Sequence, residues 1–232
     1  LKLREALARA GYSDQARMVV LNDTVATLLA AKAAGTGEHY ETYLGFILGT
    51  GLNCAYVEHN ERITKLHGHG HGSGSGAQII NMESGGFDGI AGGSVDEEFD
   101  AGTKSPGRYR LEKMVSGAYL GPLCHTLLRR AAKEGLFSDA ASEHLLNLPQ
   151  TDTVAMDGFL RAPSLRSGPI GGSCTTGADA ITAYTLLDNI VERAGKLAAL
   201  NISAAVLESG GGADPTRPAA VCVDGTTFYK TH

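Results

Sequence analysis

Residues 45–53 read GFILGTGLN, and this stretch decides how the fold is interpreted. An apolar run ends at Leu48, Gly49-Thr50-Gly51 follow, and a second beta-prone run, NCAYVE (53–58), begins at once. Glycines at such a turn let the backbone approach a bound group and point its N–H donors at phosphate oxygens. The same tripeptide can also form an ordinary hairpin turn, so both interpretations stay open for it alone. The Walker pattern that ends in Gly-Lys-Ser/Thr is absent, which excludes a P-loop enzyme.

The composition predicts a soluble globular protein. The 232 residues suffice for one large domain or two small ones, and 43% hydrophobic content can fill a buried core. Lys and Arg number 20 against 25 Asp and Glu, and a net charge of -5 gives no reason to expect nucleic acid or an anionic membrane as partner. Small or neutral ligands are the expected partners.

The cysteines and the absence of targeting segments point to a cytoplasmic protein. The four cysteines lie far apart, with no close pair of the kind that forms metal knuckles or redox motifs, and we expect them to be reduced. No apolar stretch reaches the roughly 18 residues that a membrane span needs. Leu1 is neither the start of a basic signal region nor an initiator methionine, and the chain is expected to begin inside a helix.

Periodicity predicts an alternation of helices and strands, hence an α/β protein. Helices are expected at 1–10, with a stop at Gly11, and at 25–35, where Asn22, Asp23 and Thr24 are N-cap residue types. Between them, 17–21 reads as a short buried strand, and a polar junction near 35–42 could separate two lobes. Strands are expected at 43–48, 53–58, possibly 62–66, and 77–83, joined as a meander.

The second half of the sequence predicts mostly helix. A helical pattern over 111–135 should divide at Gly121-Pro122, because proline is tolerated only in a first turn. Residues 149–178 read as irregular or partly helical, 179–208 as a long amphipathic helix, and 219–230 as a strand and turn. In the glycine tract, His67, His69 and His71 alternate with glycine, which favours a solvated loop over a metal site because it fixes no geometry.

Three carboxylates stand where they could perform chemistry. Asp23 lies at a strand-to-helix junction and could accept a proton from a hydroxyl that attacks a phosphoryl group, although helix capping explains it equally well locally. Glu83 follows a strand and Glu112 opens a helix, so each could accept hydrogen bonds from vicinal sugar hydroxyls. A solvated loop acid and a first-turn acid are the simpler interpretations.

Five blocks in order, VVLNDTVATLLA, FILGTGLNCAYVE, IINMESGGFD, LEKMVSGAYLG and VDGTTFYKTH, resemble those of the hexokinase family. The resemblance runs through nearly the whole chain and is weakest at 150–178. It implies the actin-like, ribonuclease-H-related ATPase fold, in which two lobes close on ATP and sugar. On this basis, 1–40 would be the tail of the small lobe with an interlobe helix, and 41–232 the large C-terminal lobe, incomplete at its end.

The resemblance also implies roles for single residues in an ATP-dependent phosphorylation of a hexose, with glucose the expected sugar. Asp23 matches the family's catalytic base. The phosphate-binding turn is matched by Gly49, Thr50 and Gly51, and Mg2+ would offset charge on the phosphates of ATP. The positions that bind sugar hydroxyls are matched by Asn22, Asn53, Glu83 and Glu112, and a segment near the adenosine pocket by Asp224, Gly225 and Thr226.

The sequence also departs from the family pattern. Ser84 stands where the family usually has Trp, Pro122 where an acid is usual, and Gly211 where lysine is common. No Asp-Leu-Gly-Gly-Thr block for the first phosphate turn is found, nor a small-lobe Thr-Lys segment, so the chain alone is expected to have poor activity. Two alternatives remain: a non-catalytic sugar-binding or regulatory protein, and another actin-like ATPase such as a chaperone or filament protein, which Glu83 and Glu112 disfavour.

Overall fold

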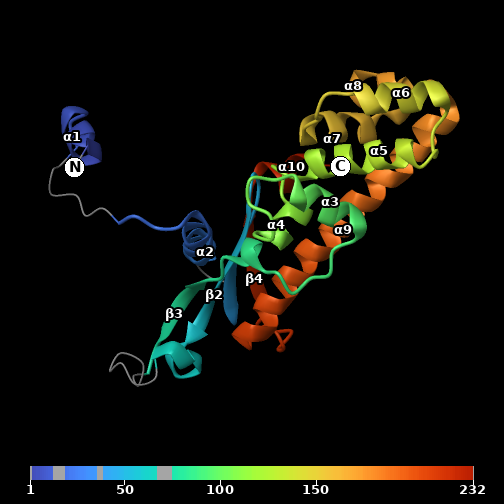
Figure 1. Cartoon of the computed structure of the whole chain (residues 1–232). Helices are drawn as coiled ribbons and strands as arrows, with labels where there is room; N and C mark the ends of the chain where they lie inside the picture. The colour runs from blue at the N-terminus through green and yellow to red at the C-terminus, as the bar shows by residue number, and fades with distance from the viewer. Residues whose placement is uncertain (1, 13–18, 36–38, 67–74, 232) are drawn as a thin grey trace.

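The computed structural model describes residues 2–12, 19–35, 39–66 and 75–231, and it is built on one mixed sheet (Figure 1). The strand order is β3-β2-β1-β4. β1, β2 and β3 form an antiparallel meander, whereas β4 pairs with β1 in parallel, Thr42 opposite Ala219. The strands are β1 (Thr42–Leu48), β2 (Leu52–His59), β3 (Ala77–Asn81) and β4 (Ala219–Asp224).

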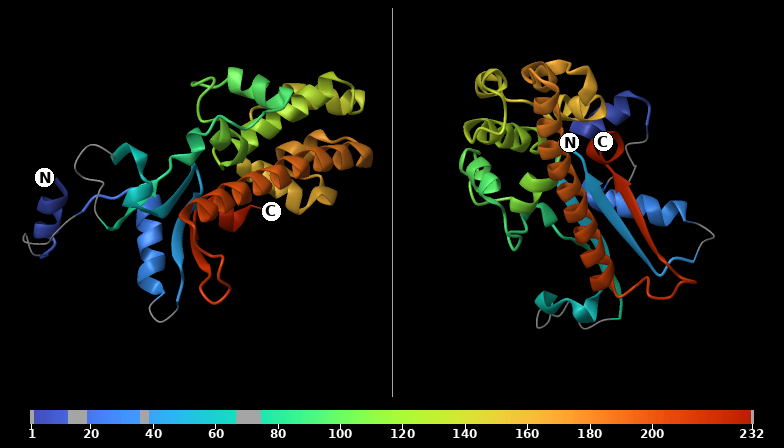
Figure 2. Two further views of the ribbon diagram at one scale, coloured as in Figure 1. Left: turned by 90° about the horizontal axis from the view of Figure 1, so that it is seen from below. Right: turned by 90° about the vertical axis from the view of Figure 1, so that its right-hand side faces the viewer.

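Helices cover both faces of this sheet. α2 lies on one face and the long α9 on the other, while α5 to α8 pack around the part of α9 that extends beyond the sheet (Figures 1 and 2). The helices are α1 (Lys2–Arg9), α2 (Asp23–Ala34), α3 (Ser94–Ala101), α4 (Arg110–Val115), α5 (Leu120–Lys133), α6 (Asp139–Asn147), α7 (Thr153–Arg161), α8 (Gly168–Ser173), α9 (Gly177–Ser209) and α10 (Thr226–Lys230). In the described chain, no helix is long and apolar enough to span a membrane.

A close approach between α2 and β1 depends on Gly45. A β-carbon at Gly45 would lie 2.2 Å from the carbonyl oxygen of Thr24 and 2.8 Å from the backbone nitrogen of Leu28. Glycine is thus the residue that lets the first turn of α2 rest directly on the strand. Leu28 is fully buried at this contact.

The main core lies on the opposite face of the sheet. Leu44 and Phe46 of β1 alternate with Gly45 and point into a cluster that includes Cys54 of β2 and Leu187 of α9.

The start of α9 is fixed by a capping box, because Thr176 Oγ1 accepts a hydrogen bond from Asp179 N and the Asp179 carboxylate accepts one from Thr176 N. Burial would raise the pKa of Asp179, but hydrogen bonds from Ser138 and Thr176 hold it well below its usual range.

Most predicted elements are confirmed, and two predicted strands are wrong. The helices at the N-terminus, at 25–35 and at 179–208, the meander, and the division of the 111–135 helix are present. Residues 62–66 instead form parts of two short 3-10 turns, because β2 already pairs with β1 and β3 on its two edges. Residues 19–21, the described part of the predicted strand 17–21, pair with no described strand, and Val20 is 96% exposed.

The segments between the predicted elements carry more helix than the sequence indicated. Residues 149–178 are partly helical, as expected, and contain α7 and α8. α3 and α6 were not predicted, and α10 replaces the expected turn after β4. His67, His69 and His71 lie outside the described residues.

Candidate active site

The Gly-Thr-Gly turn joins β1 to β2 and is fixed by two neighbouring segments. The Gly49 carbonyl accepts hydrogen bonds from Gly117 N and from Thr227 Oγ1, both at 2.8 Å. Gly225 has a φ of 128°, and a β-carbon there would lie 2.3 Å from the Leu48 carbonyl oxygen. Only glycine at 225 allows the segment after β4 to pack this tightly on the turn.

The donors and acceptors of this turn are divided between protein and solvent. Its carbonyl groups face the protein, since Thr50 O also accepts from Ala118 N at 3.2 Å. Among the described residues, no acceptor is hydrogen-bonded to the backbone N–H groups of Thr50 and Gly51, and the Thr50 side chain is exposed. Unpaired N–H groups at a glycine turn suit phosphate oxygens, so residues 49–51 fit the phosphate group expected from the sequence. We call residues 49–51 the phosphate-type turn.

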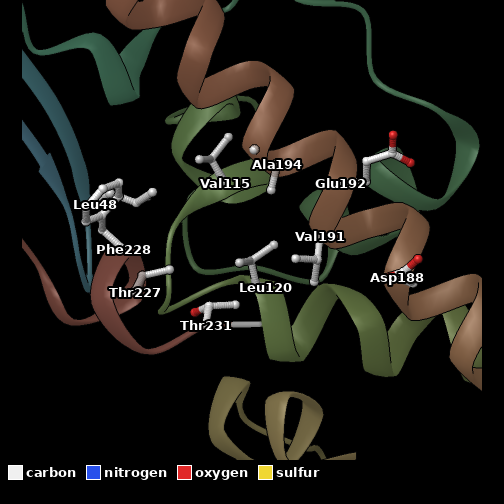
Figure 3. Close-up of a pocket in the computed structure, with 11 residues that line it drawn as sticks. Leu48, Val115, Leu120, Asp188, Val191, Glu192, Ala194, Thr227, Phe228 and Thr231 are labelled. Atoms are coloured by element: carbon white, nitrogen blue, oxygen red, sulfur yellow. The ribbon is translucent and has the colours of Figure 1, made fainter. Parts of the chain in front are cut away.

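A cavity of about 410 Å³ opens beside the turn (Figure 3). Leu48, Thr227 and Phe228 lie on one side of it, and Asp188 and Glu192 of α9 lie on the other (Figure 3). Of the predicted adenosine segment, Thr226 begins α10 beside this cavity, and the Asp224 carboxylate accepts a hydrogen bond from Gly225 N at 2.8 Å. The structure therefore places this segment against the phosphate-type turn.

A chain of hydrogen bonds connects two of the predicted sugar ligands. Asn53 is 9% exposed, and its Nδ2 donates to Asn81 Oδ1 at 2.7 Å. Asn81 Nδ2 in turn donates to Glu83 Oε1 at 2.6 Å. Asn53 Oδ1 also accepts a hydrogen bond from Ser84 N at 3.3 Å, which fixes the turn that follows Glu83. We call Asn53, Asn81 and Glu83 the polar cluster. Asn81 was missed in the sequence, although on the predicted strand 77–83 it would share a face with Glu83; in the structure β3 ends at Asn81 and Glu83 follows two residues later.

Glu112 lies between the phosphate-type turn and the turn that bears Glu83. Its Oε2 accepts a hydrogen bond from Leu52 N at 3.0 Å. A β-carbon at Gly51 would lie 2.8 Å from this oxygen, and one at Gly85 would lie 3.1 Å from it. The two glycines thus leave room for the carboxylate, which brings the phosphate-type turn and the polar cluster together.

A buried ion pair fixes the short helix α4 that carries Glu112. Lys113 is 3% exposed, pairs with Asp100, and donates to Thr103 Oγ1 at 2.8 Å and to Ser105 O at 2.6 Å. Burial would raise the pKa of Asp100, but the hydrogen bonds from Lys113 and from Gly107 N hold it below its usual value. The ammonium group of the lysine is thereby engaged by Asp100, Thr103 and Ser105 rather than by Glu112.

Asn22 and Asp23 lie at the exposed start of α2. Both side chains accept a hydrogen bond from Thr24 N, Asn22 Oδ1 at 2.9 Å and Asp23 Oδ1 at 2.8 Å. In the described part of the chain, no hydrogen bond connects either residue to the polar cluster around Asn53. The local geometry is that of a helix cap, and the Asp23 carboxylate stays open to solvent.

The departures from the family pattern have local structural explanations. Ser84 is buried and its Oγ accepts a hydrogen bond from Asn201 Nδ2 of α9 at 2.9 Å. A β-carbon at Gly211 would lie 2.7 Å from Thr42 Cγ2, so a larger residue would collide there. Pro122 lies in the first turn of α5, where its missing N–H costs no helical hydrogen bond.

In the described ranges, no group of three or more His, Cys, Asp or Glu is placed to hold a metal ion.

The fold and the site define an α/β protein of the actin-like ATPase fold. A structure titled as the hexokinase from Schistosoma mansoni complexed with glucose superposes with a TM-score of 0.72 at 25% identity, over 99% of this chain and 52% of that one. A second solved hexokinase gives 0.70 at 25% identity, over 99% of this chain and 49% of the other.

The sequence comparisons identify the family. The family model described as Hexokinase matches residues 43–232, so this chain belongs to the hexokinase family. Human Hexokinase-2 is 31% identical over 98% of this chain and 25% of its own length, and tobacco Hexokinase-1 is 39% identical over 60% of this chain and 27% of its own. The chain thus spans about a quarter of these curated relatives and about half of each solved chain.

Proposed function

We propose that the protein containing this chain transfers the γ-phosphoryl group of ATP to a hexose, with glucose the preferred sugar. The family supports sugar phosphorylation in general. The match to a structure titled as complexed with glucose supports a hexose as the acceptor. The predicted division into a small-lobe tail at 1–40 and a large lobe at 41–232 belongs to this proposal.

The position of Glu112 is the observation that carries the proposal. One oxygen of this carboxylate accepts a hydrogen bond from Leu52 N, at the start of the strand that follows the Gly-Thr-Gly turn. The same side chain packs on Gly85, two residues beyond Glu83. A phosphate-type turn and a cluster of sugar-type acceptors therefore adjoin, and this is the arrangement that phosphoryl transfer to a hydroxyl requires.

In this proposal each part of the site has one task. The sugar hydroxyls exchange hydrogen bonds with Asn22, Asn53, Glu83 and Glu112. The two carboxylates accept from the hydroxyls, the two amides accept from them or donate to them, and the acceptor oxygen is oriented in this way. Asp23 accepts the proton of that oxygen as it attacks, which its exposed carboxylate on a rigid helix start permits. The free N–H groups of the 49–51 turn hold phosphate oxygens, and 224–226 lies towards the adenosine. Mg2+ bound with ATP would offset charge on the phosphates.

The test is a comparison of two acidic residues at equivalent helix positions in the full-length protein. Asp23 is the first residue of α2, and Asp139 is the first residue of α6, far from the candidate site. Asp23→Ala should lower phosphoryl transfer to glucose about 100- to 10,000-fold, the contribution of a general base, while glucose binding is retained. Asp139→Ala should keep normal turnover.

Two results would contradict the proposal in different ways. Wild-type turnover in Asp23→Ala would remove the assignment of the base. Glucose binding by the unmodified full-length protein without any phosphoryl transfer from ATP would instead favour the non-catalytic sugar-binding alternative.

A further inference from the structure

A second cavity, of about 560 Å³, lies beside the turn that bears Glu83. It is formed between residues 82–90 and the C-terminal half of α9, and its volume is in the range of small-molecule sites. Most of its lining is apolar, supplied by Phe87, Ile90, Leu111, Leu197 and Leu200. Phe87 and Leu200 are 53% and 63% exposed, so the cavity has an open apolar mouth.

The charged groups in the described lining of this cavity are both acids. Ser84 and Asn201 line it, are hydrogen-bonded to one another at 2.9 Å, and are buried, so they join the Glu83 turn to α9. Glu83 and Asp88 supply two carboxylates, and none of the described residues that line the cavity is Lys, Arg or His. Asp88 lies in the field of Arg110, which leaves Glu83 as the stronger attraction for a cation.

We propose that this cavity binds a small amphipathic amine, with an apolar ring and one cationic nitrogen. The ring would lie against the leucines of α9 and against Phe87, which can also face a cation with its aromatic ring. The ammonium group would be hydrogen-bonded to Glu83, because Asp88, the other acid of the lining, already interacts with Arg110. Phosphates and carboxylic acids are excluded by the same charge distribution.

The amine would weaken sugar binding through Glu83. One oxygen of that carboxylate, Oε1, already accepts a hydrogen bond from Asn81, which leaves the other for either a sugar hydroxyl or an ammonium group. An amine in the cavity therefore raises the sugar dissociation constant, and the sugar raises that of the amine by the same factor. This coupling rests on the proposed role of Glu83 in sugar binding, whereas the cavity and its lining do not.

Three probes with one ring and different charge test the ligand class. Tryptamine is cationic, indole is neutral and indole-3-propionate is anionic at neutral pH. Calorimetric titration of the full-length protein without ATP or glucose should give a dissociation constant for tryptamine at least about tenfold below that of indole, the effect of one charge-assisted hydrogen bond. Equal or tighter binding of indole-3-propionate would overturn the proposal.

Variants locate the binding and keep it separate from folding. Ala204 lines the cavity and Ser203, the preceding residue of α9, is exposed and does not. Ala204→Trp should fill the cavity and lower tryptamine affinity at least tenfold, whereas Ser203→Trp should leave it unchanged. Glu83→Gln should remove the advantage of tryptamine over indole. Unchanged tryptamine binding in Ala204→Trp would refute the site.

Glucose then tests the coupling. Saturating glucose should raise the tryptamine dissociation constant, and Glu83→Gln should abolish that effect. Normal tryptamine binding that glucose does not alter would overturn the antagonism. Failure of the proposed kinase function would be seen separately, as an absence of phosphoryl transfer from ATP, because the tryptamine titration requires no catalysis.

Discussion

Asn81 provides the sharpest test of the polar cluster, because it is the only described residue that is hydrogen-bonded to both Asn53 and Glu83. Asn81→Ala removes both hydrogen bonds at once. Glu83 then loses the donor that orients its carboxylate. Its backbone has a left-handed φ of 51°, a conformation that a non-glycine residue keeps only when surrounding contacts hold it.

The magnitudes of the two effects follow from the two bonds. A hydrogen bond to a charged group contributes about 1.5–3 kcal/mol, and because Glu83 is exposed we expect the lower end of this range. Expressed in sugar binding, that is a dissociation constant raised about tenfold. The neutral bond to Asn53 contributes about 0.5–1.5 kcal/mol, which should appear in the free energy of unfolding.

The assay is glucose titration of the full-length protein, with ATP titration and urea unfolding in parallel. ATP affinity should stay unchanged, since the phosphate-type turn does not contact Asn81. Asn81→Asp is the informative companion, because it keeps the acceptor for Asn53 Nδ2 but places a second carboxylate beside Glu83. It should bind glucose more weakly than Asn81→Ala. A wild-type glucose dissociation constant in Asn81→Ala would refute the reasoning.

Three further predictions concern the supporting structure. Gly45→Ala should lower the free energy of unfolding by about 1–3 kcal/mol through overpacking against α2, whereas Gly158→Ala, in open space within α7, should not destabilise; urea unfolding compares them. The pKa of Asp100 is lower in the folded protein than in the unfolded chain, so its stabilising effect is present above about pH 4 and is lost as the pH falls through the folded-state pKa. Asp100→Asn should therefore be less stable at neutral pH and show a smaller loss in acid unfolding. In native alkylation at pH 8 followed by mass mapping, Cys222, which is partly exposed, should react, while Cys54, whose burial raises its pKa to about 11, should not; equal labelling of both would contradict this.

The elements that the sequence predicted correctly are those with strong local signals. The glycines of 49–51, the N-cap at Asn22 and the long periodic run of α9 each act through near neighbours in the chain. The wrong strand at 62–66 had a beta-prone composition, but a strand forms only where a partner edge is free, and pairing partners are set by the whole sheet. α3 had a local signal that was overlooked, since Asp96 accepts from Gly93 N at its start.

The candidate site shows the same division. Glu83 and Glu112 were singled out by their positions in the chain and, with Asn53, by the resemblance, and the structure places all three in one region with the 49–51 turn. Asn81 and the second cavity depend on contacts between residues far apart in the sequence, such as Ser84 with Asn201. Residue spacing along the chain carries no information on such contacts.

The 33 residues of α9 also restrict how this family member can vary. The helix is about 50 Å long and fixes three distant parts of the molecule, because it is capped at Asp179, forms a bidentate ion pair through Arg193 with Asp96, and holds Ser84 through Asn201. Insertion of one residue between Arg193 and Asn201 would turn the asparagine by about 100° around the helix axis and move it away from the serine. Natural relatives that keep this site should therefore differ in the exposed side chains of α9 but preserve the number of residues between those two contacts.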